Sequence, residues 1–124
     1  MTRLRDLDAS FLKYNSEDGS KHRIDNIASA DGIIFQCPKC SIGAEPFEKD
    51  GRKGFCGPHY VMCLFVGRVA DDVGPTGRWI PSGTCLDDFT FVTSEDHPKC
   101  SVLMLSGCHW HGFLREGSAT IDPN

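Results

Sequence analysis

Apolar positions near the start of the chain recur at helical spacing, with charged residues between them. Residues three or four positions apart lie on one face of an α-helix, so residues 3–14 are predicted to form a short amphipathic helix. Residues 25–32 predict a brief helical turn that ends at Gly32. The apolar positions of the first segment are Leu4, Leu7, Phe11 and Leu12.

After residue 32 the pattern changes to short β-branched and aromatic runs separated by glycine, proline and aspartate. Such runs predict strands joined by turns. Residues 45–58 and 70–77 are rich in turn-forming and charged residues and predict loops, and Glu116-Gly117 predicts a turn before a last short strand. The predicted strands lie within residues 33–37, 59–67, 87–94, 101–106 and 111–116.

These elements predict an α+β fold that is mainly β. The 124 residues, 40 % of them hydrophobic, can build one modest core. We therefore expect a single domain over residues 1–124, in which a helical N-terminal segment, residues 1–32, lies against a small antiparallel, zinc-stabilised β domain, residues 33–124.

The charge distribution narrows the choice of partners. Thirteen Lys and Arg oppose seventeen Asp and Glu, which gives a net charge of −4, and no basic run exceeds residues 21–23. A surface that follows nucleic-acid phosphates needs the opposite balance. The first ten residues lack the apolar core of a signal peptide, and no later run reaches membrane-spanning length. We expect a cytoplasmic protein that binds neither nucleic acid nor membrane.

The chain contains seven cysteines, an odd number. A disulfide framework would require an oxidising compartment and an even set, whereas cysteine pairs near histidines in a reducing compartment indicate metal binding. We therefore expect reduced thiols and a metal site.

Two short motifs predict the ligands of that metal. Cys37 and Cys40 enclose Pro-Lys in a tight turn, which directs two thiolates at one ion. Cys108 and His111 repeat this spacing and are followed by glycine. Two such knuckle-like turns supply a closed Cys3His set, which is typical of structural rather than catalytic zinc.

Two other histidines could also serve as ligands, so the ligand set is not fixed by these motifs alone. His59 begins the strand over residues 59–67 and is the best reserve ligand, and His109 could replace His111 if the second turn is drawn differently. Cys56 lies close to His59 and could join a second cluster. Cys63 alternates with apolar neighbours in a strand, which favours burial over ligation.

Two further cysteines, Cys85 and Cys100, have no partner at metal-like spacing. A free cysteine often behaves as a small apolar residue. We interpret both as structural or incidental.

Five segments in order carry a resemblance to a known family: RLRDLDASFL, ADGIIFQCPKC, GPHYVMCLF, GRWIPSGTCLDDFTF and GCHWHGFLREG. The chain resembles a group of small uncharacterised bacteriophage and prophage proteins, a domain of unknown function with some members mislabelled ammonia monooxygenase. The resemblance covers nearly the whole chain. It implies a metal-binding phage protein without an established activity, present in the bacterial host cytoplasm during infection.

Within that resemblance, the four predicted zinc ligands match the metal-like positions of the family pattern, and His59 matches a recurring histidine. The chain departs from the pattern in its TFVTS segment, residues 90–94, and in its extra Cys85 and Cys100.

Two classes of function follow. The first is a zinc-stabilised module that binds a host or phage protein, either to counteract a host defence or as a minor virion or assembly component. The second is a small hydrolase-like zinc enzyme that uses His59, His109 and Glu116 around an open metal position. A closed four-ligand site leaves no room for substrate, so we favour the interaction module over an enzyme.

Overall fold

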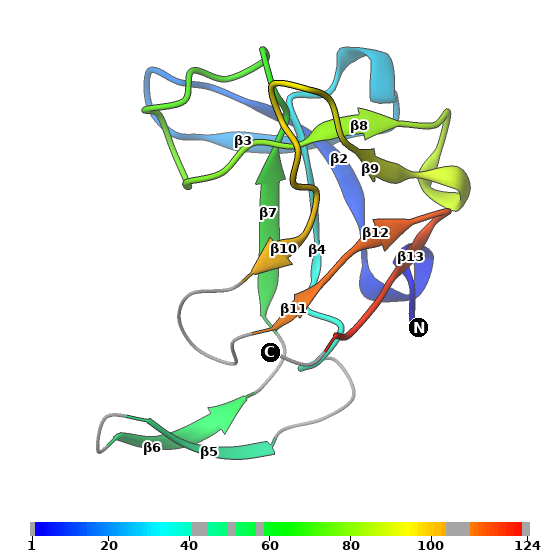
Figure 1. The fold of residues 1–124 in the computed structure, drawn as a ribbon. Coiled ribbons are helices and arrows are strands. Elements are labelled where there is room, and N and C mark those ends of the chain that lie inside the picture. The colour runs from blue at the N-terminus through cyan, green and yellow to red at the C-terminus, as the bar shows by residue number, and fades with distance from the viewer. Residues whose placement is uncertain (1, 41–44, 50–51, 57–58, 104–109, 123–124) are drawn as a thin grey trace.

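The computed structural model describes residues 2–40, 45–49, 52–56, 59–103 and 110–122. These residues form short antiparallel strands and three turns of 3-10 helix (Figure 1). The prediction of a mainly β, antiparallel fold is confirmed. In the described part of the chain, no helix is long and apolar enough to cross a membrane.

A four-stranded antiparallel sheet in the order β3-β2-β4-β7 forms the centre of the fold. Its inner strands pack on both faces, because Phe11 and Phe35 belong to the main core cluster while Leu12 joins Leu64 in a smaller cluster on the other side. The strands are β2 (Ser10–Tyr14), β3 (Lys21–Ile24), β4 (Gly32–Gln36) and β7 (Tyr60–Leu64). Strands β4 and β7 confirm two of the predicted runs.

The predicted N-terminal helix over residues 3–14 is wrong. The structure has a 3-10 turn, η1 (Leu4–Leu7), which ends at Asp8 in a left-handed conformation with φ 51°, followed by β2. Phe11 and Leu12 are both buried because neighbouring residues of a strand face opposite sides of the sheet. Two adjacent apolar residues therefore fit a strand covered on both faces as well as they fit a helix.

The prediction of a loop over residues 45–58 is also wrong. Strands β5 (Glu45–Lys49) and β6 (Arg52–Cys56) pair as an antiparallel hairpin, which stands apart from the other sheets in Figure 1. The sequence between them is Asp50-Gly51. This dipeptide strongly favours two-residue hairpin connections, so the hairpin could have been predicted.

Several smaller predictions are confirmed. The helical turn within residues 25–32 is η2 (Ile27–Ser29), whose capping residue Asn26 accepts a hydrogen bond from the Ala28 amide at 2.9 Å. Gly32 begins strand β4 rather than ending this turn. Residues 70–77 contain no strand.

The chain after residue 79 contributes to three small sheets, one of which also includes β1. The turn predicted at Glu116-Gly117 is present, with φ values of 47° and 78° that suit a tight hairpin. Strands β8 (Ile80–Ser82) and β9 (Thr90–Val92) pair around the 3-10 turn η3 (Leu86–Asp88), β10 (Val102–Leu103) pairs with β11 (His111–Gly112), and β13 (Ser118–Ala119) lies between β1 (Thr2–Arg3) and β12 (Leu114–Arg115).

Aromatic residues join these small pairings to the central sheet. Trp110 is fully buried, meets Phe35 edge-on at a centroid distance of 5.8 Å, and donates its indole N–H to the Thr120 carbonyl at 2.9 Å. Phe89 stacks on Phe65 at 6.0 Å. The main core is therefore one aromatic layer between the central sheet and the C-terminal strands.

A single arginine organises the loop that precedes β8. Arg78 directs all five of its N–H donors to backbone carbonyls at 2.5–3.2 Å, so the loop wraps around one guanidinium. This loop supplies Val69 and Val73 to the smaller core cluster. The acceptors are the carbonyls of Val69, Ala70, Val73, Pro75 and Gly77.

We expect Arg78→Met to lower the free energy of unfolding by about 2–4 kcal/mol, because it leaves several carbonyls without their charged donor. Arg68→Met is the matched control, since Arg68 donates to one carbonyl, that of Ala28. Urea unfolding of both variants measures the difference. Equal losses in the two variants would show that Arg78 does not organise the loop.

Candidate metal site

The pairing of β4 with β7 places a cysteine beside a histidine. Gln36, the last residue of β4, lies opposite Tyr60, the first residue of β7. Cys37 and His59 are the next residues outward on the two strands, and the Cys37 amide donates to the His59 carbonyl at 2.8 Å. Their side chains therefore start from neighbouring points of one ladder.

The Cys37–Cys40 turn adds a second sulfur. The Cys40 amide donates to the Cys37 carbonyl at 3.2 Å, which closes a four-residue turn with Pro38 at its second position. Proline fixes φ at the value that this position requires. Pro38 is itself buried, so the turn is anchored in the protein.

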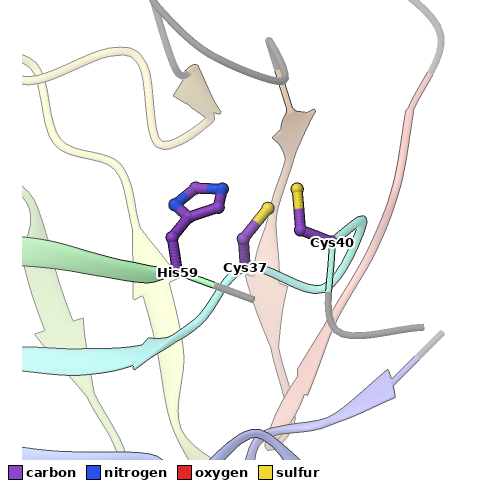
Figure 2. Close-up of side chains that lie close together, drawn as sticks. All are labelled: Cys37, Cys40 and His59. Atoms are coloured by element: carbon purple, nitrogen blue, oxygen red, sulfur yellow. The ribbon is translucent and has the colours of Figure 1, made fainter. Parts of the chain in front are cut away.

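Three donor atoms converge as a result. The sulfurs of Cys37 and Cys40 and one ring nitrogen of His59 all lie within 4.8 Å of one another. Figure 2 shows the three side chains rising to the same side of the turn and of the start of β7. Zinc ligands at about 2.0–2.3 Å from the ion lie roughly 3.3–3.8 Å apart in a tetrahedron. Small side-chain rotations would therefore bring these donors to bonding distance of one ion.

The three donor residues differ in their exposure to solvent. Both cysteines are fully buried, whereas His59 is partly exposed. Burial makes an unpaired thiolate costly, and a divalent cation between two thiolates removes that cost. The group could hold a metal ion reached from the side of His59.

Cys40 carries one further property. It is disulfide-bonded in the structure, whereas Cys63, Cys85 and Cys100 are free cysteines. A sulfur within a disulfide is not a thiolate and does not coordinate a metal in that form. The Cys40 sulfur can therefore join a metal site only after this disulfide is reduced, and the expectation of reduced thiols is wrong for Cys40 in this structure.

The structure places the predicted ligands as follows. Cys37 and Cys40 lie together, and the reserve ligand His59 joins them. His111 is not a member of this group; it lies in β11 with its ring 6.0 Å from that of Phe113. Cys108 and His109 lie outside the described residues, so the predicted four-ligand set of Cys37, Cys40, Cys108 and His111 is not tested as a whole, and a ligand role for Cys108 or His109 stays a prediction.

The remaining cysteines have other environments. Cys63 is fully buried in the main core, and burial raises the pKa of its thiol, so it stays protonated and unsuited to ligation. Cys85 is exposed and Cys100 is partly buried, and neither belongs to the donor group. The side chain of Cys56 lies outside the described residues.

The inclusion of His59 depends on strand pairing rather than on motif spacing. Cys40 and His59 are nineteen positions apart, the difference of their numbers, a separation without a simple motif. Cys37, however, is the last residue of one predicted strand and His59 begins the other. Antiparallel pairing of those two strands, if assumed, would have placed these residues side by side.

Comparison of the chain with models of protein families, with curated proteins and with solved structures finds no match. The resemblance to phage and prophage proteins therefore stays a prediction. Inference about function rests on the geometry of the chain itself.

We expect Cys37→Ser and His59→Ala to weaken zinc binding by about 100-fold or more, since even the loss of a group that only orients a ligand costs 10–100-fold. Cys63→Ala should lose stability through its cavity and keep the metal. His111→Ala should also keep it. Competition with a chromophoric chelator under reducing conditions measures all four affinities. Loss of zinc from His111→Ala but not from His59→Ala would overturn the geometric assignment.

Proposed function

We propose that the protein is a zinc-stabilised β domain that acts by binding another protein. The observation that carries this proposal is the convergence of two buried cysteine sulfurs and one imidazole on a single point. Thiolate and imidazole donors together are typical of zinc among the common biological cations, because calcium and magnesium select oxygen ligands.

A structural role for the zinc suits the described residues better than a catalytic one. Catalytic zinc sites keep an open position for water, usually beside a general acid or base. Glu116, the acid of the enzyme alternative, lies in the turn between β12 and β13 and is not a member of the donor group. Two of the three donors are fully buried, which leaves little access for a substrate.

The position of the group gives the metal a structural task. Strand β4 ends at Gln36 and β7 begins at Tyr60, and residues 41–58, between Cys40 and His59, carry the β5–β6 hairpin. An ion bound to Cys40 on one side and to His59 on the other would hold the two ends of this segment together. A two-stranded hairpin is marginally stable alone, so such a clamp stabilises both the hairpin and the sheet edge from which it departs.

The proposed partner is a protein, since the net charge of −4 opposes binding to nucleic acid. The resemblance to phage and prophage proteins supports a partner in the infected bacterial cell, where the module would counteract a host defence. Binding modules of this kind need a rigid scaffold more than reactive groups, and a metal clamp supplies rigidity in a small domain.

Under reducing conditions, we expect about one zinc per chain. Its removal by a chelator should lower the thermal midpoint by roughly 10 °C or more, because zinc binding in such sites contributes directly to folding. Trypsin should then cut faster after Lys49, Arg52 and Lys53 than after Lys13 in the central sheet. Elemental analysis, calorimetry and mass spectrometry of the fragments measure these effects. A protein that binds no zinc, or one whose midpoint is unchanged after zinc removal, would contradict the proposal.

A further inference from the structure

Residues 110–115 show a strict alternation between buried and accessible side chains. Trp110, Gly112 and Leu114 are buried, and the residues between them are not. Successive residues of an extended chain face opposite sides, so the alternate residues His111, Phe113 and Arg115 share one outward face. This segment contains His111, a predicted zinc ligand that does not belong to the donor group.

The three outward side chains form a continuous stack. The guanidinium carbon of Arg115 lies 4.2 Å from the centroid of the Phe113 ring, and the rings of Phe113 and His111 are 6.0 Å apart. A guanidinium over an aromatic face is held by cation–π attraction and loses little freedom on binding a further group. Arg115 is therefore oriented before any partner arrives.

An exposed apolar residue extends this stack. Leu103 lies directly opposite His111 in the β10–β11 pairing, so the two side chains share a face, and Leu103 is 50 % exposed. We name the set Leu103, His111, Phe113 and Arg115 the outer strip. It presents an apolar end at Leu103 and a cationic end at Arg115.

The cationic end has no acidic partner in the described part of the chain. Among the residues that the structure describes, no carboxylate lies within ion-pair distance of Arg115. The register places Arg115 opposite Ser118, and Ser118 opposite Arg3, so two arginines flank one serine on the same face. Arg3 forms an ion pair with Asp87 at 3.4 Å, so the positive charge of the outer strip comes from Arg115.

We propose that the outer strip binds an extended segment of a partner protein that carries a carboxylate beside an apolar side chain. The carboxylate would accept hydrogen bonds from the Arg115 guanidinium, and the apolar side chain would cover Leu103 and the edge of Phe113. This inference rests on the proposed function and names the chemistry of the partner.

The same geometry disfavours single-stranded nucleic acid as the occupant. Proteins bind such strands by stacking bases on open aromatic faces along a basic groove. Arg115 already covers one face of Phe113, and His111 is its neighbour on the strip. A carboxylate, by contrast, needs only the outer N–H groups of the guanidinium.

The test is a selection from a yeast-displayed library of random peptides against the full-length, zinc-loaded protein. We expect the selected peptides to be enriched in Asp or Glu adjacent to Leu, Ile or Phe. Arg115→Gln should weaken their binding by about tenfold or more, the effect of losing a charge-assisted hydrogen bond. Lys99→Gln removes the same charge from another exposed position and should leave binding unchanged.

Zinc content and thermal midpoint of each variant separate this inference from the proposed function. If the variants keep zinc and fold but Arg115→Gln binds the selected peptides as tightly as the unaltered protein, the outer strip is not the binding surface. A selection that yields no acidic peptides, or tighter binding of labelled oligothymidine than of the best peptide, also overturns the inference. Loss of zinc from the unaltered protein would instead count against the proposed function.

Discussion

The antiparallel pairing of β4 with β7 is the constraint on which the other features depend. Its five residue pairs, from Gly32 with Leu64 to Gln36 with Tyr60, set both the core and the candidate metal site. At one end the pairing buries Ile33 and Cys63 in the main core, and at the other it brings Cys37 beside His59. A one-residue slip would turn the buried residues outward and separate the metal donors.

Much of this arrangement follows from the sequence. Runs such as IIFQC and HYVMCL are strands in any fold that gives them a covered face, and Glu116-Gly117 fits a tight hairpin turn because both residues can adopt positive φ. The secondary structure of the N-terminal segment could not be predicted in this way. The periodicity of Leu4, Leu7 and Phe11 suits a helix locally, and only the pairing of β2 with β3 and β4 makes the strand more favourable.

The candidate site was predictable to a similar extent. Cys37 and Cys40 follow from a local turn, since proline and the spacing of the two sulfurs depend on four consecutive residues. His59 depends on a contact between distant parts of the chain, which spacing rules do not describe. His111 matched a motif by spacing, yet alternation in its strand directs it to the outer strip with Phe113 and Arg115.

Short strands need additional support in a chain of 124 residues. Two features share one physical principle here, a cation that is surrounded by electron-rich atoms of the backbone or of side chains. Arg78 does this with five carbonyls on one side of the central sheet. The Cys37, Cys40 and His59 group would surround a metal ion in the same way at the end of β4 and β7.

This proposed site requires a ligand shell of both sulfur and nitrogen. X-ray absorption spectroscopy of the reduced, zinc-loaded protein tests this ligand shell directly. We predict sulfur at about 2.3 Å together with imidazole nitrogen at about 2.0 Å, whereas a shell of oxygen and nitrogen without sulfur would contradict the site.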